Sequence, residues 1–215
     1  MSFSEFKRHA FNVLFAALLG KEPLPVNCRP WLVHDTFNRP NEAIAQLASG
    51  HRPLPGAAWR VENGQLRPAS AEGTTCLLVN AGARDVDASV DIFLEQTRNE
   101  AAAGLAVRAA DAGNMDRFFL QAKGPGVEAR IDTLINGQRR AEERWIIPAI
   151  KRGFTLRVVA AGDEFIYLID GTEVKRLKRA PSAAGMGVGV VNGGGEASRL
   201  DNLEVRAPGS VFSAQ

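Results

Sequence analysis

The sequence predicts an all-β domain, folded as a two-sheet antiparallel sandwich, with an α-helical extension at its N-terminus. Three observations support this class. About a dozen short segments with strand-like patterns follow residue 31, turn residues separate them at regular spacing, and an apolar stretch with helical periodicity precedes them. We therefore divide the chain into a helix over 1–22, a proline-containing spacer over 23–32, a sandwich domain over 33–207 and a tail over 208–215.

The N-terminal stretch has the start, the end and the apolar stripe of an amphipathic helix. Ser2 and Glu5 form a capping box, and Gly20 stands where a helix C-terminus is expected. The apolar stripe contains Phe3, Phe6, Phe11, Leu14, Phe15 and Leu18. Because so large a stripe is stabilised by burial, we expect these six residues to form an assembly interface with another chain. Packing of the helix on its own domain is the alternative.

The same stretch does not fit a targeting or membrane segment. A cleavable signal peptide ends at small residues, whereas Leu18 and Leu19 precede Gly20 here. A membrane span needs roughly 20 apolar residues, and this run is shorter. We therefore expect no cleaved signal peptide and no membrane span.

Alternation and turn residues define the strands of the sandwich. The clearest strand covers 86–94, where Val, Ala, Ile and Leu face one way and Asp87, Asp91 and Phe93 face the other. Segment 164–170 is apolar on both faces, which predicts a central strand. The predicted hairpin turns lie at 111–114, 161–163 and 170–171. One short helix is expected within 41–49, ending at Gly50.

Five stretches carry a recognisable set of motifs in a fixed order. They are DTFNR (35–39), WRVENGQL (59–66), GLAVRAADAGNMDRFFL (104–120), LRVVAAGDEFIYLIDGTEV (156–174) and GMGVGVVNGGGEASRLDNLEV (185–205). This order resembles the laminin-G-like, concanavalin A-like jelly-roll superfamily over about residues 33–206. The resemblance implies a jelly roll in which the opening D-x-F-x-R strand and the closing D-N-x-x-V strand lie side by side. It does not select a function, because lectins, hydrolases and structural modules share the fold.

Asp87, Asp91 and Glu95 are the nearest match to the catalytic carboxylates of superfamily members that resemble laminarinases. Their four-residue spacing places neighbours about 13 Å apart along a strand. Glycosidase pairs lie roughly 5–9.5 Å apart, so these three acids do not form one. The chain also lacks the G-x-S-x-G motif that presents a nucleophilic serine, and neither cysteine has a histidine motif near it. We expect no catalytic residue and no enzyme activity, although carboxylates from separate strands could still converge.

Trp145, with Arg140 and Arg144 beside it, is the best exposed candidate for ligand binding. A tryptophan can stack on a sugar, but Trp and Arg are equally typical of protein interfaces. Trp59 and Tyr167 fall at predicted core positions, so we expect both to be buried.

Asp35 and Asp201 are weak candidates for a metal site. The superfamily resemblance implies a structural calcium near the terminal strands, where these two residues lie. Calcium binds about six to eight oxygens, so two aspartates do not complete a site. We expect no cofactor and keep structural calcium as the alternative.

The composition and the net charge argue against nucleic-acid binding. The chain has 215 residues, 45% of them apolar and 23% charged, and a net charge of +2, which is too small for a dedicated nucleic-acid binder. The basic cluster at 175–179 is therefore expected to be a solvated strand face. Cys28 and Cys76 make no metal or disulfide framework, and two buried thiols are expected rather than one bridge.

These features together predict a non-enzymatic structural or adhesive virion protein, such as a phage tail, baseplate or capsid appendage. Its fold is typical of extracellular recognition, it has no signal peptide, and similar lectin-like modules are attached to phage structural proteins. It would be made in the host cytoplasm, anchored by its N-terminal helix to other virion proteins or to copies of itself, and would bind a cell-surface glycan. The alternative is a free carbohydrate-binding module, and the third hypothesis is a glycoside-acting enzyme.

Overall fold

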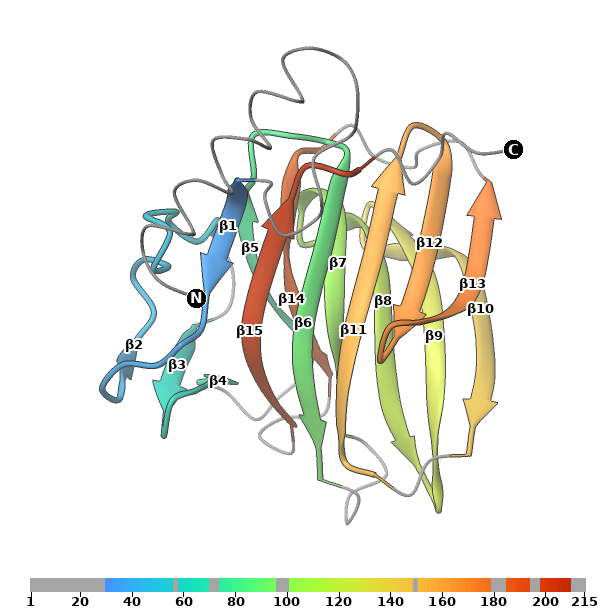
Figure 1. Cartoon of the computed structure of the whole chain (residues 1–215), viewed down its shortest axis with the longest axis horizontal. Coiled ribbons are helices and arrows are strands. Elements are labelled where there is room, and N and C mark those ends of the chain that lie inside the picture. The colour runs from blue at the N-terminus through green and yellow to red at the C-terminus, as the bar shows by residue number, and fades with distance from the viewer. Residues whose placement is uncertain are drawn as a thin grey trace, which may run out of the picture.

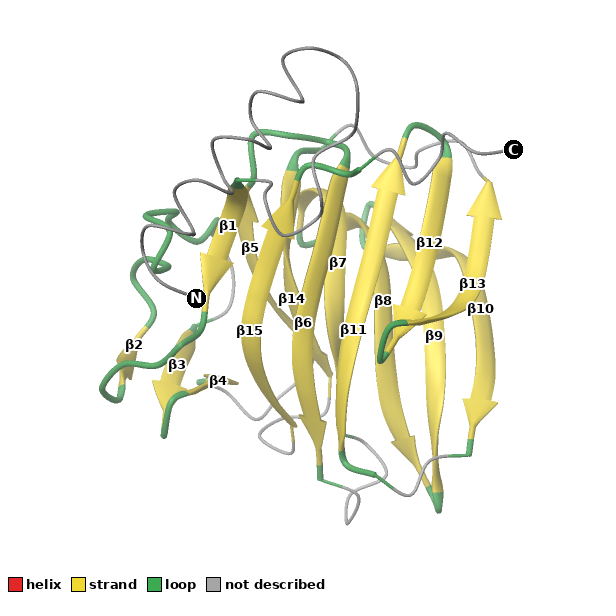
Figure 2. Cartoon of the chain, viewed as in Figure 1, coloured by secondary structure: helices red, strands yellow, loops and turns green. Residues whose placement is uncertain are grey.

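Two antiparallel β-sheets stacked face to face make up the described part of the chain (Figures 1 and 2). The computed structural model describes residues 30–55, 58–69, 74–95, 101–148, 151–178, 185–193 and 198–209. These ranges contain strands and no helix, so they contain no helix that could cross a membrane. The all-β, two-sheet prediction is confirmed. The predicted N-terminal helix with its six interface residues, Cys28 and the end of the predicted tail lie outside the described residues.

The larger sheet has nine strands, in the order β13-β12-β11-β6-β15-β4-β3-β2, with β1 also paired to β15. Its strands are β1 (Trp31–Asp35), β2 (Glu42–Ala43), β3 (Trp59–Glu62), β4 (Gln65–Pro68), β6 (Val86–Leu94), β11 (Gly153–Ala161), β12 (Glu164–Ile169), β13 (Thr172–Lys178) and β15 (Ser198–Arg206). The smaller sheet has six strands in the order β10-β9-β8-β7-β14-β5. These are β5 (Thr74–Asn80), β7 (Ala102–Asp111), β8 (Asn114–Lys123), β9 (Gly126–Ile135), β10 (Gln138–Ile147) and β14 (Gly187–Gly193).

The terminal strands pair as the jelly-roll resemblance implies. β1 runs antiparallel to β15, with Val33 opposite Val205 and Asp35 opposite Leu203. The three predicted hairpins also form, between β7 and β8, β11 and β12, and β12 and β13. In the last of these Asp170 and Gly171 both have positive φ, at 51° and 78°, which is the backbone of a two-residue type I′ turn.

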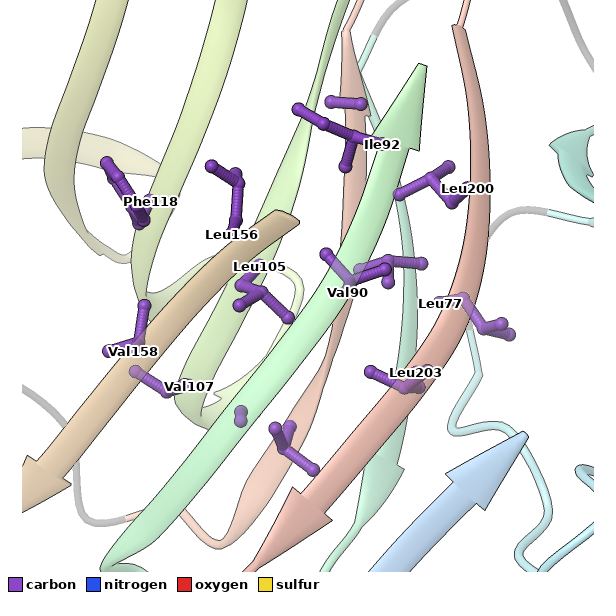
Figure 3. Packing of buried hydrophobic residues seen from close by; sticks show 14 of the residues in the cluster. Leu77, Val90, Ile92, Leu105, Val107, Phe118, Leu156, Val158, Leu200 and Leu203 are labelled. Atoms are coloured by element: carbon purple, nitrogen blue, oxygen red, sulfur yellow. The ribbon is translucent and has the colours of Figure 1, made fainter. Parts of the chain in front are cut away.

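The hydrophobic core lies between the two sheets. Alternation on β6 directs Val86, Ala88, Val90, Ile92 and Leu94 inward, and all five are buried. Figure 3 shows Leu105 of β7 and Phe118 of β8 from the opposite sheet, together with Leu156 of β11 and Leu203 of β15 from the same sheet as β6. Trp59 and Tyr167 belong to the same cluster, so their predicted burial is confirmed.

A buried arginine joins the two sheets at one end of the sandwich. Arg108 of β7 has a left-handed backbone (φ 52°), and its side chain is fully buried. Its Nη2 donates to Gly162 O at 2.8 Å and lies 3.0 Å from Asp85 Oδ1, while its guanidinium carbon is 4.5 Å from the Phe165 ring centroid. Burial lowers the pKa of Arg108, and the charge of Asp85 partly offsets this. The contacts connect β7 of one sheet to the β11–β12 turn of the other.

The short helix predicted within 41–49 is wrong. Glu42 and Ala43 instead form β2 and pair with β3, and Gly50 follows a turn with φ 86°. The Ala48 amide donates to Asp35 Oδ2 at 2.9 Å, so this donor binds a buried carboxylate of β1 and is not used in a helix. A tertiary hydrogen bond therefore overrides the weak local helix propensity.

Candidate functional site

A groove of about 280 Å³ lies on the outer face of the nine-stranded sheet. We call it the aspartate groove. Its lining residues come from β4, β6, β11, the β12–β13 turn and β15, and they include Gln65, Asp91, Phe93, Gly153, Thr155, Asp170, Arg199 and Asp201. Three of these strands, β15, β6 and β11, lie side by side at the front of Figure 1.

Strand alternation and register place three polar side chains in one row across this face. Asp91 faces outward because Val90 and Ile92, its neighbours on β6, point into the core. Thr155 of β11 and Asp201 of β15 are the cross-strand partners of Asp91 on its two sides. Two carboxylates from strands far apart in sequence are therefore directly opposed, although carboxylates along β6 alone could not meet.

Neutral donors orient the two carboxylates. Asp91 Oδ1 accepts from Thr155 Oγ1 at 2.6 Å, and its Oδ2 accepts from Asn202 Nδ2 at 2.7 Å. Asp201 Oδ1 accepts from the backbone amide of Asn202 at 2.7 Å. Asn202 can serve both acids because it has φ 50° at a register shift between Asp201 and Glu204.

The surroundings of Asp201 favour its protonated form. Burial raises the pKa of Asp201, and the nearby charges of Asp91 and Asp35 raise it further, whereas the hydrogen bond from Asn202 lowers it in part. Among the described residues, neither aspartate forms an ion pair with Lys or Arg.

An aromatic ring forms the apolar part of the groove. Phe93 of β6 faces outward and lies opposite Gly153 of β11; a Cβ added at Gly153 would be 3.6 Å from the Phe93 ring. The Arg199 guanidinium carbon lies 5.6 Å from the ring centroid on the β15 side, and Arg199 Nη2 is 3.1 Å from Glu95 Oε1. The glycine therefore leaves the space beside the ring free of a side chain.

Asp87 and Glu95, the other members of the predicted carboxylate trio, have partners of their own. Asp87 is buried and accepts two hydrogen bonds from Arg157, both at 2.6 Å, so it is an ion-paired residue. Glu95 pairs with Arg199 at the end of the groove. Only Asp91 of the three lies at the centre of the groove.

Asp35 does not share a site with Asp201. Its carboxylate is fully buried and accepts from the Phe37 amide at 2.7 Å, the Ala48 amide at 2.9 Å and Arg39 Nη1 at 2.9 Å. Its oxygens therefore hold the loop after β1. Across the described ranges, no cluster of three or more His, Cys, Asp or Glu side chains has the geometry to hold a metal.

The structure does not bring Trp145, Arg140 and Arg144 together. Trp145 is half-buried and packs against the inner cluster, whereas Arg144, the preceding residue on β10, is exposed and pairs with Glu142 at 2.8 Å. Arg140 is exposed and lies at a register shift in β10. Successive residues of a strand face opposite ways, so the three cannot form one surface.

Comparison with known proteins identifies the fold and no family. No family profile and no curated protein matches the sequence. Similar solved structures include the carbohydrate-binding module CBM66 from Bacillus subtilis, at 19% identity and a TM-score of 0.56 over 73% of this chain and 95% of that one. A non-specific endo-β-1,3(4)-glucanase of family GH16, SCLam, shares 15% identity with a TM-score of 0.56 over 86% and 93% of the two chains.

A third similar structure is described as a pseudo β-1,3-glucanase and immunostimulatory antigen of Mycobacterium tuberculosis. It shares 14% identity with a TM-score of 0.51 over 82% of this chain and 98% of that one. Binding modules and glycoside hydrolases thus occur among the similar structures, and all three identities are too low to indicate more than fold. The chain has the two-sheet jelly-roll sandwich fold of these structures.

Proposed function

We propose that the chain is a non-enzymatic carbohydrate-binding module and that the aspartate groove holds the sugar. The observation that carries this proposal is the combination of a half-buried ring, Phe93, with two outward-facing carboxylates, Asp91 and Asp201, in one groove. An aromatic ring packs against the apolar face of a sugar, and carboxylates accept hydrogen bonds from its hydroxyl groups. The likeness to a carbohydrate-binding module agrees with this proposal at the level of fold.

The hydrogen bonds within the groove support the same proposal. Each ionised carboxylate has about four lone-pair sites, and the described donors fill two on Asp91 and one on Asp201. The remaining sites can accept sugar hydroxyls. Because Thr155 and Asn202 already fix Asp91, its side chain loses little rotamer freedom on binding.

A glycan array probed with the full chain tests the proposal. We expect binding to a restricted set of glycans and a loss of about two- to tenfold in affinity for Phe93→Ala, because ring stacking contributes about 0.5–1.5 kcal/mol beyond burial. Ile146→Ala is the matched control, since Ile146 is an exposed apolar residue on the other sheet. Absence of glycan binding, or an equal loss in both variants, would contradict the proposal.

We further propose that the module is displayed on a virion and anchored through residues 1–22, with other virion proteins or further copies of this chain as partners. The apolar stripe of that segment supports the proposal, because Phe and Leu side chains gain roughly 1.5–3 kcal/mol each on burial. The test is to change Phe6, Phe11 and Leu14 together to Ser and to measure incorporation into the parent particle. Normal incorporation with a destabilised sandwich would show that the segment packs on its own domain.

A glycoside-acting enzyme is the second candidate function, and the opposed carboxylates favour it. Directly opposed residues on antiparallel strands have Cβ atoms about 4.5–5.5 Å apart, so the two carboxyl groups can reach the roughly 5–5.5 Å separation of retaining glycosidases. The raised pKa of Asp201, with the carboxylate of Asp91 directly opposite, also resembles an acid–nucleophile pair. Release of reducing ends from a bound glycan, abolished by Asp201→Asn and Asp91→Asn, would replace the binding proposal with this one.

A further inference from the structure

A second cavity, of about 350 Å³, lies on the outer face of the six-stranded sheet and has the opposite charge character. We call it the arginine pocket. Its walls include Thr74, Cys76, Arg117, Leu134 and Arg139, and no acidic residue lines it. It lies on the opposite side of the sandwich from the aspartate groove, with the core between them.

Small residues in the middle of the six-stranded sheet help to leave room for this pocket. Ala106 of β7 lies between Arg117 of β8 and Gly189 of β14 in the sheet register. Gly189 cannot carry a side chain, since an added Cβ would lie 1.9 Å from Leu77 O. Longer side chains on both sides, including Leu134 and Cys76, belong to one apolar cluster with Ala106. The central strands therefore carry short side chains here, and the longer side chains on both sides form the walls of the pocket.

Two arginines share a single carboxylate at one wall. Arg117 is 7% exposed and donates from Nε and Nη2 to the two oxygens of Asp132, at 2.6 and 2.7 Å. Arg139 Nε lies 3.2 Å from Asp132 Oδ2, and Asp132 itself is fully buried. The second acid near Arg139, Glu142, is also paired with Arg144. Positive charge therefore exceeds negative charge at this wall.

Arg117 also has an unused donor. Its Nη1 donates to no described residue, yet it is not among the fully buried unsatisfied atoms, so it has contact with solvent. Since Arg117 lines the pocket, this nitrogen has access to a ligand there. Thr74 adds an exposed hydroxyl, and Leu134 and Cys76 add an apolar wall.

We propose that the arginine pocket binds the carboxylate of an acidic sugar residue of the uronic acid class. Guanidinium groups bind carboxylates through short, charge-assisted hydrogen bonds, and Arg117 is already held in place by Asp132. The apolar wall accommodates the ring that carries the carboxylate. The choice of a sugar rests on the proposed carbohydrate-binding function, whereas the choice of a carboxylate rests only on this pocket.

The test uses the full chain with Cys28→Ser, in which Cys76 is the remaining thiol and reports occupancy of the pocket. Labelling of Cys76 by N-ethylmaleimide is followed by mass spectrometry with added D-glucuronate, and with D-glucose as the uncharged match. We expect glucuronate to slow labelling and glucose to leave it unchanged at equal concentration. Arg139→Gln should lower the affinity for glucuronate roughly ten- to hundredfold, which is the effect of losing one hydrogen bond to a charged group.

Arg144→Gln is the control, because Arg144 lies on the same strand and pairs with Glu142 but does not line the pocket. In this variant glucuronate should slow the labelling of Cys76 as much as in the parent chain. Failure of glucuronate to protect Cys76, equal protection by glucose, or an equal loss in both arginine variants would overturn the proposal. Phe93→Ala should leave the protection unchanged, so the outcome is independent of the aspartate groove.

Discussion

Asp201→Asn should stabilise the fold at neutral pH, because it removes one of two directly opposed negative charges. Asp201 and Asp91 face each other across β15 and β6, and like charges in this position destabilise a sheet by about 0.2–1 kcal/mol. The asparagine oxygen can still accept the hydrogen bond from the Asn202 amide. Since the groove is open to solvent, we expect about 0.5 kcal/mol, which corresponds to a rise of about 1–2 °C in Tm for a domain of this size.

The pH dependence of this gain follows from the raised pKa of Asp201. A carboxyl whose folded pKa lies above its unfolded pKa stabilises the fold while it is protonated, and this contribution is lost as pH rises through the folded pKa. The parent chain therefore loses stability over this range and the variant does not. The gain from Asp201→Asn should be full above the raised pKa and should vanish below the ordinary pKa of an aspartate.

Urea unfolding of both proteins at pH 7 and at pH 3 measures this gain. Asp91→Ala is the control: Asp91 accepts from both Thr155 and Asn202, and alanine leaves both of these side chains without their acceptor. We expect this control to be less stable than the parent at pH 7. A loss of stability in Asp201→Asn at pH 7, or the same gain at both pH values, would refute the reasoning.

Three further predictions concern other parts of the chain. Arg108→Ala should cost about 2–5 kcal/mol in urea unfolding, because a fully buried side chain that joins the two sheets is removed; less than 1 kcal/mol would contradict this role. Asp87→Ala should cost about 1–3 kcal/mol, because Arg157 loses both of its hydrogen bonds, whereas exposed Glu173→Ala should change stability little. In the Cys28→Ser chain Cys76 should react with iodoacetamide at pH 8 more slowly than free cysteine, because burial raises its pKa and Arg117 lowers it only in part; an equal rate would contradict this.

Local patterns predicted the strands and hairpins well for a physical reason. The alternation of 86–94 separates an inward and an outward face without any knowledge of neighbouring strands, and Asp170-Gly171 requires the positive φ values that a tight hairpin uses. The pairing of β1 with β15 was predicted only through the motif order. The segment 41–49 was predicted wrongly, because its backbone is held by Asp35 from another element.

The centre of the aspartate groove could not be predicted from the sequence. Asp91 and Asp201 meet because β15 pairs with β6 in one register, and a shift of one residue would direct Asp201 toward the core. Nothing in either segment alone specifies that register. The alternation placed Phe93 on the outer face. The open space beside its ring, however, depends on Gly153 of β11, which lies sixty residues later in the chain. The sequence indicated Asn202 only as part of the closing D-N-x-x-V motif, and its contact with Asp91 was not predicted.

The most direct test of the central proposal is to map glycan contacts on the full chain by NMR. Titration with the best glycan from the array should shift the amide signals of Phe93, Thr155 and Asn202, which lie on three adjacent strands of the nine-stranded sheet. Signals from the exposed β13 edge, such as Arg176, should not move. Shifts confined to β13 or to the six-stranded sheet, with the three groove signals unchanged, would contradict binding in the aspartate groove.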